Sequence, residues 1–211
     1  MRVMTKNKLI AGFGVNDADY NVYRYSKLDG KLEWACPYYI SWKGMVVRCY
    51  SEKALNKRPN YRGCSVCDDW VYFSNFKAWM EQQDWEGKQL DKDILIPKNK
   101  VYSPETCVFV DQKVNAFITE NKKNKGKCPV GVNYTKNMAT LNYRAECWSV
   151  VEKVNKKIGC FATPEEAHLA WLAFKLEQAY ILAAGQTDER VAKALVYRYE
   201  NYGQLFTEEA A

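Results

Sequence analysis

The sequence predicts an α+β protein of 211 residues, folded as two modules joined by a basic linker. Three observations favour this class. Apolar residues recur at helical spacing in the first half of the chain, they alternate with polar residues in three short runs after residue 130, and a helix with a clear start signal follows those runs. Aromatic residues make up 14% of the chain, as expected of compact modules. We place the modules and linker at residues 1–120, 121–129 and 130–185, with a C-terminal helix at 186–211.

Two short helices are expected in the first module. The stretch from Trp42 to Tyr50 has apolar residues at helical spacing, and the stretch from Asn75 to Gln82 repeats that spacing with Phe76 and Trp79. One stripe of such a helix must face inward. We therefore assign these aromatic side chains to a core rather than to the stacking of nucleic-acid bases.

The boundary between the modules is a lysine-rich stretch from Asn121 to Lys127, which is broken by Gly126 just before Pro129. The net charge of +6 is moderate, but the basic residues concentrate in this middle part of the chain. A polyanion is the natural partner of such a stripe. The alternative is that the linker lysines only form a solvated loop. The four lysines concerned are Lys122, Lys123, Lys125 and Lys127.

The second module reads as three short strands, at residues 131–134, 141–148 and 157–161, followed by one helix. That helix begins with a capping box, because Thr163 is a suitable N-cap, Pro164 suits the first turn and Glu166 stands three residues after the cap. Gly185 ends it. A last helix, capped by Thr187, is expected from 188 to about 202 and is assigned as a brace or an oligomer contact.

Eight cysteines occur in a chain that has no apolar stretch near ~18 residues, so we expect a protein without a membrane span, in a reducing cytoplasm. The cysteines are then buried thiols or metal ligands. Cys64 and Cys67 have the spacing of zinc ligands, and Cys49 and Cys107 could complete a four-thiolate site. Simple packing of small apolar side chains is the alternative.

The first module carries several dispersed motifs, namely Trp42-Lys43-Gly44-Met45, Arg48-Cys49-Tyr50, Cys64 to Trp70, Phe73-Ser74-Asn75-Phe76, Leu90-Asp91-Lys92-Asp93, and Tyr102 to Cys107. Together they resemble the HNH-type proteins of bacteriophages. The resemblance implies an HNH-like ββα finger flanked by short helices, in the cytoplasm of a bacterial host. It places Asp91, Lys92, Thr106 and Asn115 at the catalytic positions of the finger.

An HNH finger needs a divalent metal, a base that activates water and a frame that fixes both. Asp91, Asp93 and Asn115 are candidate ligands for Mg²⁺ or Mn²⁺. Lys92 stands where the histidine base belongs, and two neighbouring carboxylates favour its charged form, which cannot accept a proton. Lys92 is therefore assigned to a phosphate contact or a structural ion pair. Thr106 replaces an asparagine, so two positions of the motif have drifted.

The segment from Gly159 to Ala167, with the pattern Gly-x-Phe-x-Thr-x-Glu-Glu-Ala, resembles an APETALA2-type DNA-binding domain, and the likeness covers about 130 to 184. It implies that one face of the sheet enters the major groove while the helix covers the other. On the helix side we expect Val132, Tyr134, Ala145, Cys147 and Ile158. On the DNA side we expect Asn133, Thr135, Arg144, Glu146, Trp148, Asn155 and Lys157.

Among these residues Arg144 suits guanine, Asn133 suits adenine and Glu146 suits the amino group of cytosine. Trp148 could instead serve cross-strand packing. His168, the only histidine, lies on the helix of this module and is assigned to packing or surface.

The sequence thus predicts a protein that binds double-stranded DNA and carries a degenerate HNH frame. A metal-dependent HNH homing or nicking endonuclease is the alternative, and a protein that binds a host protein is a weaker one. The target sequence and the oligomeric state stay open.

Overall fold

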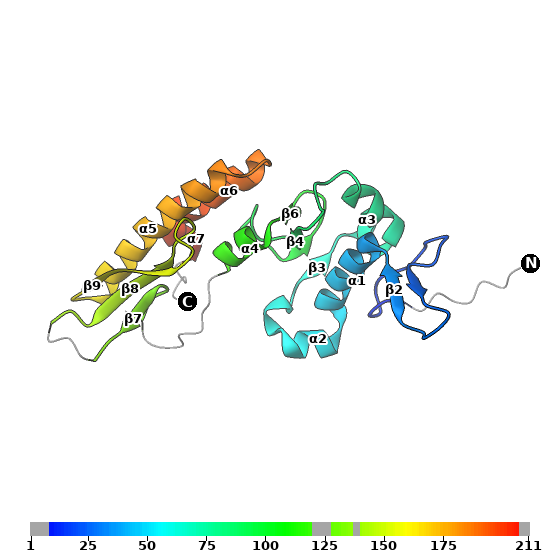
Figure 1. Cartoon of the computed structure of the whole chain (residues 1–211), viewed down its shortest axis with the longest axis horizontal. Coiled ribbons are helices and arrows are strands. Elements are labelled where there is room, and N and C mark those ends of the chain that lie inside the picture. The colour runs from blue at the N-terminus through cyan, green and yellow to red at the C-terminus, as the bar shows by residue number, and fades with distance from the viewer. Residues whose placement is uncertain (1–8, 120–127, 137–139, 207–211) are drawn as a thin grey trace, which may run out of the picture. The chain divides into compact units, whose positions relative to one another are not determined.

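A computed structural model of the chain describes residues 9–119, 128–136 and 140–206. The four linker lysines (Lys122, Lys123, Lys125 and Lys127) lie outside the described residues. Figure 1 shows helices mixed with small sheets, so the predicted α+β class is confirmed. The chain divides into two compact units, Met1–Asp111 and Gln112–Ala211. No helix in the described ranges is both long and apolar enough to cross a membrane.

The first unit consists of short helices and three two-stranded sheets. Strand β1 (Tyr23–Tyr25) pairs antiparallel with β2 (Leu32–Ala35), β3 (Ser65–Val66) pairs parallel with β5 (Val101–Tyr102), and β4 (Gln89–Asp91) pairs antiparallel with β6 (Val108–Val110). The helices are α1 (Pro37–Tyr50), α2 (Glu52–Lys57) and α3 (Phe73–Met80), with 3₁₀ turns η1 (Pro59–Tyr61) and η2 (Asp68–Val71). The two helices expected from apolar spacing are thus α1 and α3.

Aromatic rings from α1, η2 and α3 form the core of the first unit. Trp42, Trp70, Phe73 and Phe76 are almost completely buried, and the indole Nε1 of Trp42 donates a hydrogen bond of 2.8 Å to the carbonyl oxygen of Trp70. Edge-to-face and tilted contacts join these rings at centroid distances of 5.0 to 5.6 Å. The prediction that the aromatic stripes of both helices face a core is therefore confirmed, although Trp79 is only half-buried.

The second unit contains a three-stranded antiparallel sheet in the order β7-β8-β9. Its strands are β7 (Val132–Tyr134), β8 (Tyr143–Trp148) and β9 (Asn155–Phe161), and helix α5 (Pro164–Ala184) packs along one face of the sheet, as Figure 1 shows. The expected capping box is present, because Thr163 Oγ1 accepts the amide of Glu166 at 3.2 Å and the Glu166 carboxylate accepts the amide of Thr163 at 3.3 Å.

Two further helices follow α5, namely α6 (Glu189–Glu200) and α7 (Tyr202–Phe206). Asp188, not the expected Thr187, caps α6, since its carboxylate accepts the amide of Arg190 at 2.9 Å. A carboxylate is the stronger acceptor at the positive end of a helix.

Helix α4 (Gln112–Ile118), which the sequence placed in the first module, clusters with the second unit. The end of α4 explains this difference. Lys175 Nζ and the Tyr199 hydroxyl donate to the carbonyl oxygen of Phe117 at 2.8 and 3.3 Å, and the Arg198 guanidinium lies 3.5 Å from that of Ile118. The last carbonyls of a helix lack partners within it and attract positive charge. Buried cations from α5 and α6 therefore fasten α4 to the second unit.

Candidate nucleic-acid interface

The sheet of the second unit has one covered face and one open face. Val132, Ala145 and Cys147 are at most 4% exposed and face α5. Because side chains alternate along a strand, the residues between them in register lie on the open face. The pairs are Asn133 with Arg144, Glu146 with Lys157, and Trp148 with Asn155. The structure thus brings together six of the seven side chains expected on the DNA side.

A bulge decides which residue of β9 stands beside Glu146. Ala145 pairs with Gly159, but the next residue, Glu146, pairs with Lys157 rather than with Ile158. The extra residue shifts the register by one position, as a bulge does. A lysine therefore lies across from the carboxylate on the open face, and Ile158 is only half-buried.

Glu146 holds two neighbours in place on the open face. One carboxylate oxygen lies 3.0 Å from Arg144 Nε, and the other accepts a hydrogen bond of 3.0 Å from the Asn133 side-chain amide. The side chain of Glu146 is 22% exposed and that of Arg144 is 37% exposed. The carboxylate thus joins two strands through their side chains and orients an arginine at the surface.

Two residues depart from the expected arrangement of the sheet. Thr135 uses both its amide and its hydroxyl to bond the carbonyl oxygen of Asn142, at 2.8 and 3.2 Å, so it fastens the connection between β7 and β8. Tyr134, expected against the helix, is 54% exposed and contacts the ring of Tyr143. Both stand at the end of β7, beyond the cover of α5.

Behind the sheet, Gly131 and His168 fix the start of β7. Gly131 has a φ of +80°, and a β-carbon there would lie 2.2 Å from the ring of Trp171. Its carbonyl oxygen accepts the amide of Glu146 at 3.0 Å. His168 Nδ1 lies 2.9 Å from the carbonyl oxygen of Val130, and its ring stacks on Trp171. The assignment of His168 to packing is confirmed.

Lys92, at the position of the missing histidine base, is a buried structural cation. Its side chain is 6% exposed. The ammonium donates to the Asp93 carboxylate at 2.5 Å and to the carbonyl oxygen of Asn99 at 2.6 Å, and it lies 5.8 Å from the centre of the Tyr102 ring. Of its two expected roles, the ion pair is confirmed. A phosphate contact is excluded in this conformation because the ammonium does not reach the surface.

The remaining polar groups around Lys92 bond to one another and to the backbone. Asp91 Oδ1 accepts the amides of Asp93 and Ile94, both at 2.7 Å, and burial raises the pKa of the Asp91 carboxyl. The Asn99 side-chain amide donates to the carbonyl oxygens of Lys92 and Val101 at 2.8 and 2.6 Å.

Thr106 Oγ1 donates to the carbonyl oxygen of Val101 at 2.7 Å and lies 3.2 Å from the amide nitrogen of Ser103. Together with the bonds of Asp91, Lys92 and Asn99, this arrangement fixes the loops between β4 and β6. Asn115, the last position of the motif, lies on α4 in the second unit.

The three candidate metal ligands are divided between the units, since Asp91 and Asp93 belong to the first and Asn115 to the second. Within residues 9–119, 128–136 and 140–206, no three side chains of His, Cys, Asp or Glu are grouped so that they could hold a metal. Asp93 bonds the Lys92 ammonium, and a positive charge beside a metal ligand opposes binding of a second cation. We therefore derive no chemical step through a metal at Asp91, Asp93 and Asn115.

Most of the four cysteines proposed for zinc lie inside the first unit. Cys49, Cys64 and Cys107 are buried and Cys67 is half-buried, and the described residues contain no group of three such ligands. Burial raises the pKa of the Cys49 and Cys107 thiols to about 12.

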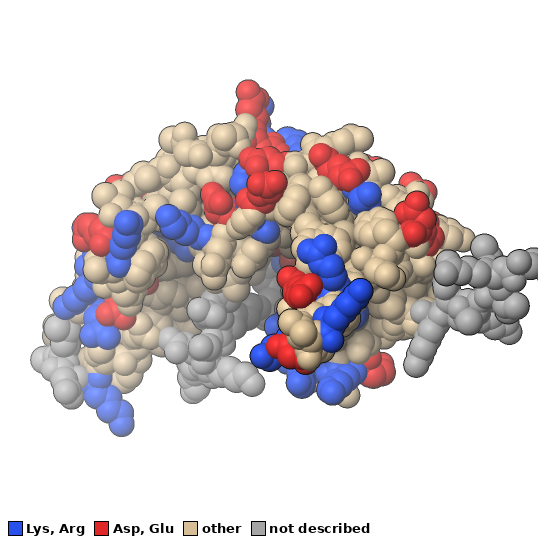
Figure 2. Space-filling view, turned by 45° about the vertical axis from the view of Figure 1, so that its right-hand side comes forward, with Lys and Arg blue, Asp and Glu red and all other residues tan. Residues whose placement is uncertain are grey.

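Acidic and basic side chains are interspersed over the face of the molecule that Figure 2 shows. Sequence reasoning missed the ion pair of Glu146 with Arg144 and its hydrogen bond from Asn133, and it missed Lys175. A signal for Lys175 exists, since it follows Trp171 by four residues and so shares the inward stripe of α5.

Comparison of the chain with protein-family models, curated proteins and solved structures found no match.

Proposed function

We propose that this protein binds double-stranded DNA through the open face of the β7-β8-β9 sheet, and that the HNH-like part of the first unit has a structural rather than a catalytic role. The observation that carries the proposal is the ion pair of Glu146 with Arg144 and its hydrogen bond from Asn133, on a face whose reverse is covered by α5. Such a face is rigid and presents hydrogen-bonding groups outward. The resemblance to an APETALA2-type domain points to the same surface.

The chemistry of the face suits base edges and phosphates. An arginine in an ion pair keeps N–H donors for a ligand, and guanine presents two acceptors in the major groove. Glu146 then acts mainly by orienting Arg144 and Asn133, rather than by accepting a bond from cytosine as the sequence suggested. Lys157 is exposed and suits a phosphate, while Trp148, which is 53% exposed, offers an apolar edge to a sugar or a thymine methyl. The linker lysines would add phosphate contacts.

The endonuclease alternative has one observation in its favour. Strands β4 and β6 pair antiparallel, and α4 follows β6 directly, which is the order of elements in a ββα finger. Against it, Lys92 is buried in an ion pair and Thr106 bonds the backbone. A positioned general base contributes ~10²–10⁴ in rate, so a finger without one should cleave very slowly.

DNA binding is tested by fluorescence anisotropy with a labelled duplex at two salt concentrations. Each phosphate contact steepens the fall of log affinity with log salt by about 0.9. We expect Lys157→Ala to flatten that slope by about one contact. Lys193→Ala is a matched control, because Lys193 is 79% exposed on α6, away from the sheet. Equal slopes for wild type and Lys157→Ala would contradict the proposed surface.

Cleavage is tested on the same preparation by adding Mg²⁺ or Mn²⁺ to supercoiled plasmid. We expect no site-specific nicking from the wild type. Nicking that disappears in Asp91→Ala would refute the structural role of the finger and establish the endonuclease alternative.

A further inference from the structure

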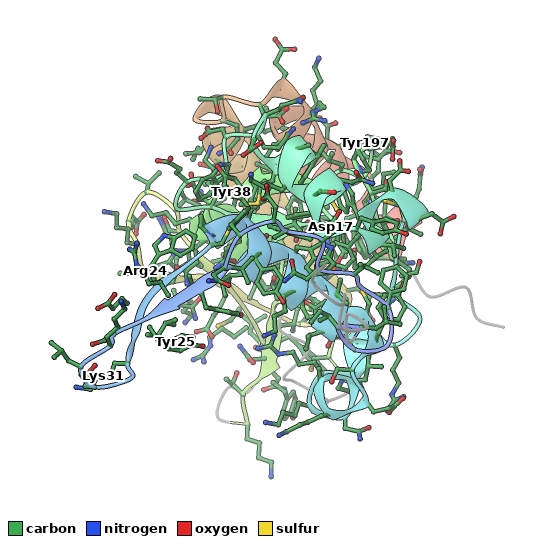
Figure 3. The ribbon with its side chains drawn as sticks, turned by 90° about the vertical axis from the view of Figure 1, so that its right-hand side faces the viewer. Asp17, Arg24, Tyr25, Lys31, Tyr38 and Tyr197 are labelled. Atoms are coloured by element: carbon green, nitrogen blue, oxygen red, sulfur yellow. The ribbon has the colours of Figure 1, made fainter. Side chains whose placement is uncertain are left out.

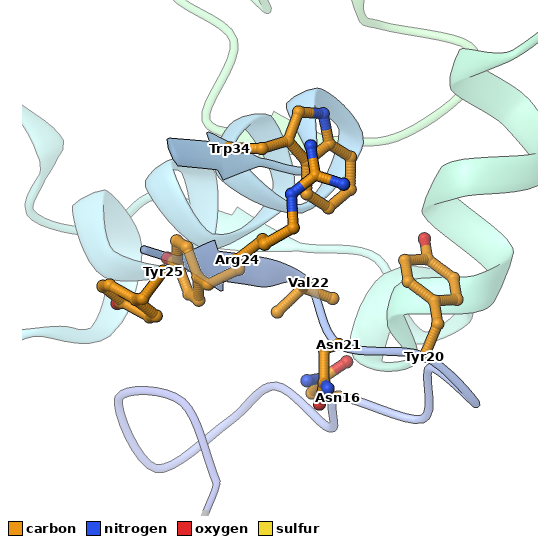
Figure 4. A pocket seen from close by; sticks show the side chains of 8 residues that line it. Asn16, Tyr20, Asn21, Val22, Arg24, Tyr25 and Trp34 are labelled. Carbon is orange, nitrogen blue, oxygen red and sulfur yellow. The ribbon is translucent and has the colours of Figure 1, made fainter. Parts of the chain in front are cut away.

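The β1–β2 hairpin of the first unit borders an open pocket of about 680 Å³. Figure 4 shows Trp34 and Arg24 along one side and Asn16, Asn21 and Tyr20 along the other. The volume lies in the range of about 300–1,000 Å³ that is typical of small-ligand sites. The other lining residues are Val22, Tyr23 and Tyr25.

Three aromatic side chains in or beside this hairpin are partly exposed. Tyr25 is 56% exposed, Trp34 is 39% exposed and Tyr20 is 38% exposed. In Figure 3 the strands and their turn at Lys31 project from the body of the unit, with Arg24 and Tyr25 along them. Because these rings gather around one pocket, they form a contiguous apolar surface that suits a ligand.

Arg24 and Trp34 form a cross-strand pair at the edge of the pocket. They are direct partners in the sheet register, and the guanidinium carbon lies 5.9 Å from the centre of the indole ring. The guanidinium is also 3.8 Å from Glu33, a distance too long for a firm hydrogen bond. An indole face beside a guanidinium suits a flat ring that carries a negative group.

We propose that this pocket binds one nucleotide of a single-stranded nucleic acid. The base stacks on Trp34, the phosphate meets Arg24, and the side-chain amides of Asn16 and Asn21 lie within reach of the base edge. Bases in a duplex are already paired and stacked, so only an unpaired base can enter such a pocket. The inference rests on the first unit alone and is independent of duplex binding by the second unit.

The test is the anisotropy of labelled oligothymidine and oligouridine with the full chain, which separates DNA from RNA as the source of the nucleotide. Loss of one stacking platform weakens single-strand binding roughly 5- to 150-fold. We expect such a loss for Trp34→Ala with at least one oligomer. Trp34→Phe keeps a ring and should retain most of the affinity. Tyr197→Ala is the control, because Tyr197 is an aromatic residue of the second unit that is 52% exposed.

Duplex affinity is measured for the same variants, together with their thermal unfolding. We expect Trp34→Ala to keep the Tm and the duplex affinity of the wild type, whereas Arg144→Ala affects the duplex alone. Unchanged single-strand affinity in Trp34→Ala would overturn the proposal. An equal loss for duplex and single strand would also overturn it, since the hairpin would then contact the backbone without selecting an unpaired base. If only Arg144→Ala loses affinity, and only for duplex, the proposal of duplex binding by the second unit stands and the proposal of a nucleotide in this pocket fails.

Discussion

Replacement of Lys92 by methionine should destabilise the first unit without affecting DNA binding. Methionine keeps the apolar stem beside Tyr102 but removes the ammonium. The buried bond from Lys92 to the carbonyl oxygen of Asn99 then has no replacement, and hydrogen bonds of charged groups contribute about 1.5–3 kcal/mol. The pair with Asp93 adds at most about 1 kcal/mol, because Asp93 is 44% exposed and water screens it.

The desolvation cost of burying an ammonium disappears in the variant and offsets part of this loss. We therefore expect the free energy of unfolding of the first unit to fall by about 2 kcal/mol. For a unit of this size that corresponds to a decrease in Tm of about 10 °C.

Urea unfolding followed by tryptophan fluorescence measures this change. Five of the seven tryptophans lie in the first unit, so the signal reports mainly on that unit. They are Trp34, Trp42, Trp70, Trp79 and Trp85. Lys53→Met is the matched control, because Lys53 is exposed on α2 and its loss should leave the midpoint unchanged. An unchanged midpoint for Lys92→Met, or loss of a metal-dependent cleavage activity without loss of stability, would refute the structural role of Lys92.

Three further predictions concern the turn after β4, the sheet face and the start of β7. Burial raises the pKa of Asp91, so its contribution to stability is fully present below the unfolded pKa and is lost as the pH rises through the folded value. Asp91→Asn, which keeps the acceptor oxygen, should therefore equal or exceed the wild type in unfolding free energy at pH 7, and a stability below that of the wild type would contradict this. Arg144→Ala should change the duplex sequences recovered by selection, whereas Lys157→Ala should weaken all of them about equally; the same recovered motif for wild type and Arg144→Ala would exclude base contact by Arg144. Gly131→Ala should lower the Tm of the second unit strongly, because the residue has a positive φ and its new methyl group would overlap Trp171. Calorimetry of the full chain measures this Tm, and a transition at the wild-type temperature would be inconsistent with the close approach of Gly131 and Trp171.

The sequence alone determined the elements that local chemistry specifies. The start of α5 follows from Thr163, Pro164 and Glu166, three neighbours whose side chains cap the first amides of the helix. The alternation along β8 determined which residues share a face, since successive side chains in a strand point to opposite sides. Helical spacing likewise identified the buried faces of α1 and α3.

Tertiary structure alone decided what the polar side chains do. Lys92 became a buried cation because the loop that carries Asn99 folds over it, seven residues further along the chain. Glu146 accepts a hydrogen bond from Asn133, which lies thirteen residues earlier in the sequence. Lys175 donates to the carbonyl oxygen of Phe117 at the end of α4, fifty-eight residues earlier. A carboxylate or an ammonium has the same sequence letter whether it meets water, DNA or a buried carbonyl. Its role depends on which distant backbone or side-chain atoms the fold brings within about 3 Å, and hydrophobic periodicity carries no information about that choice.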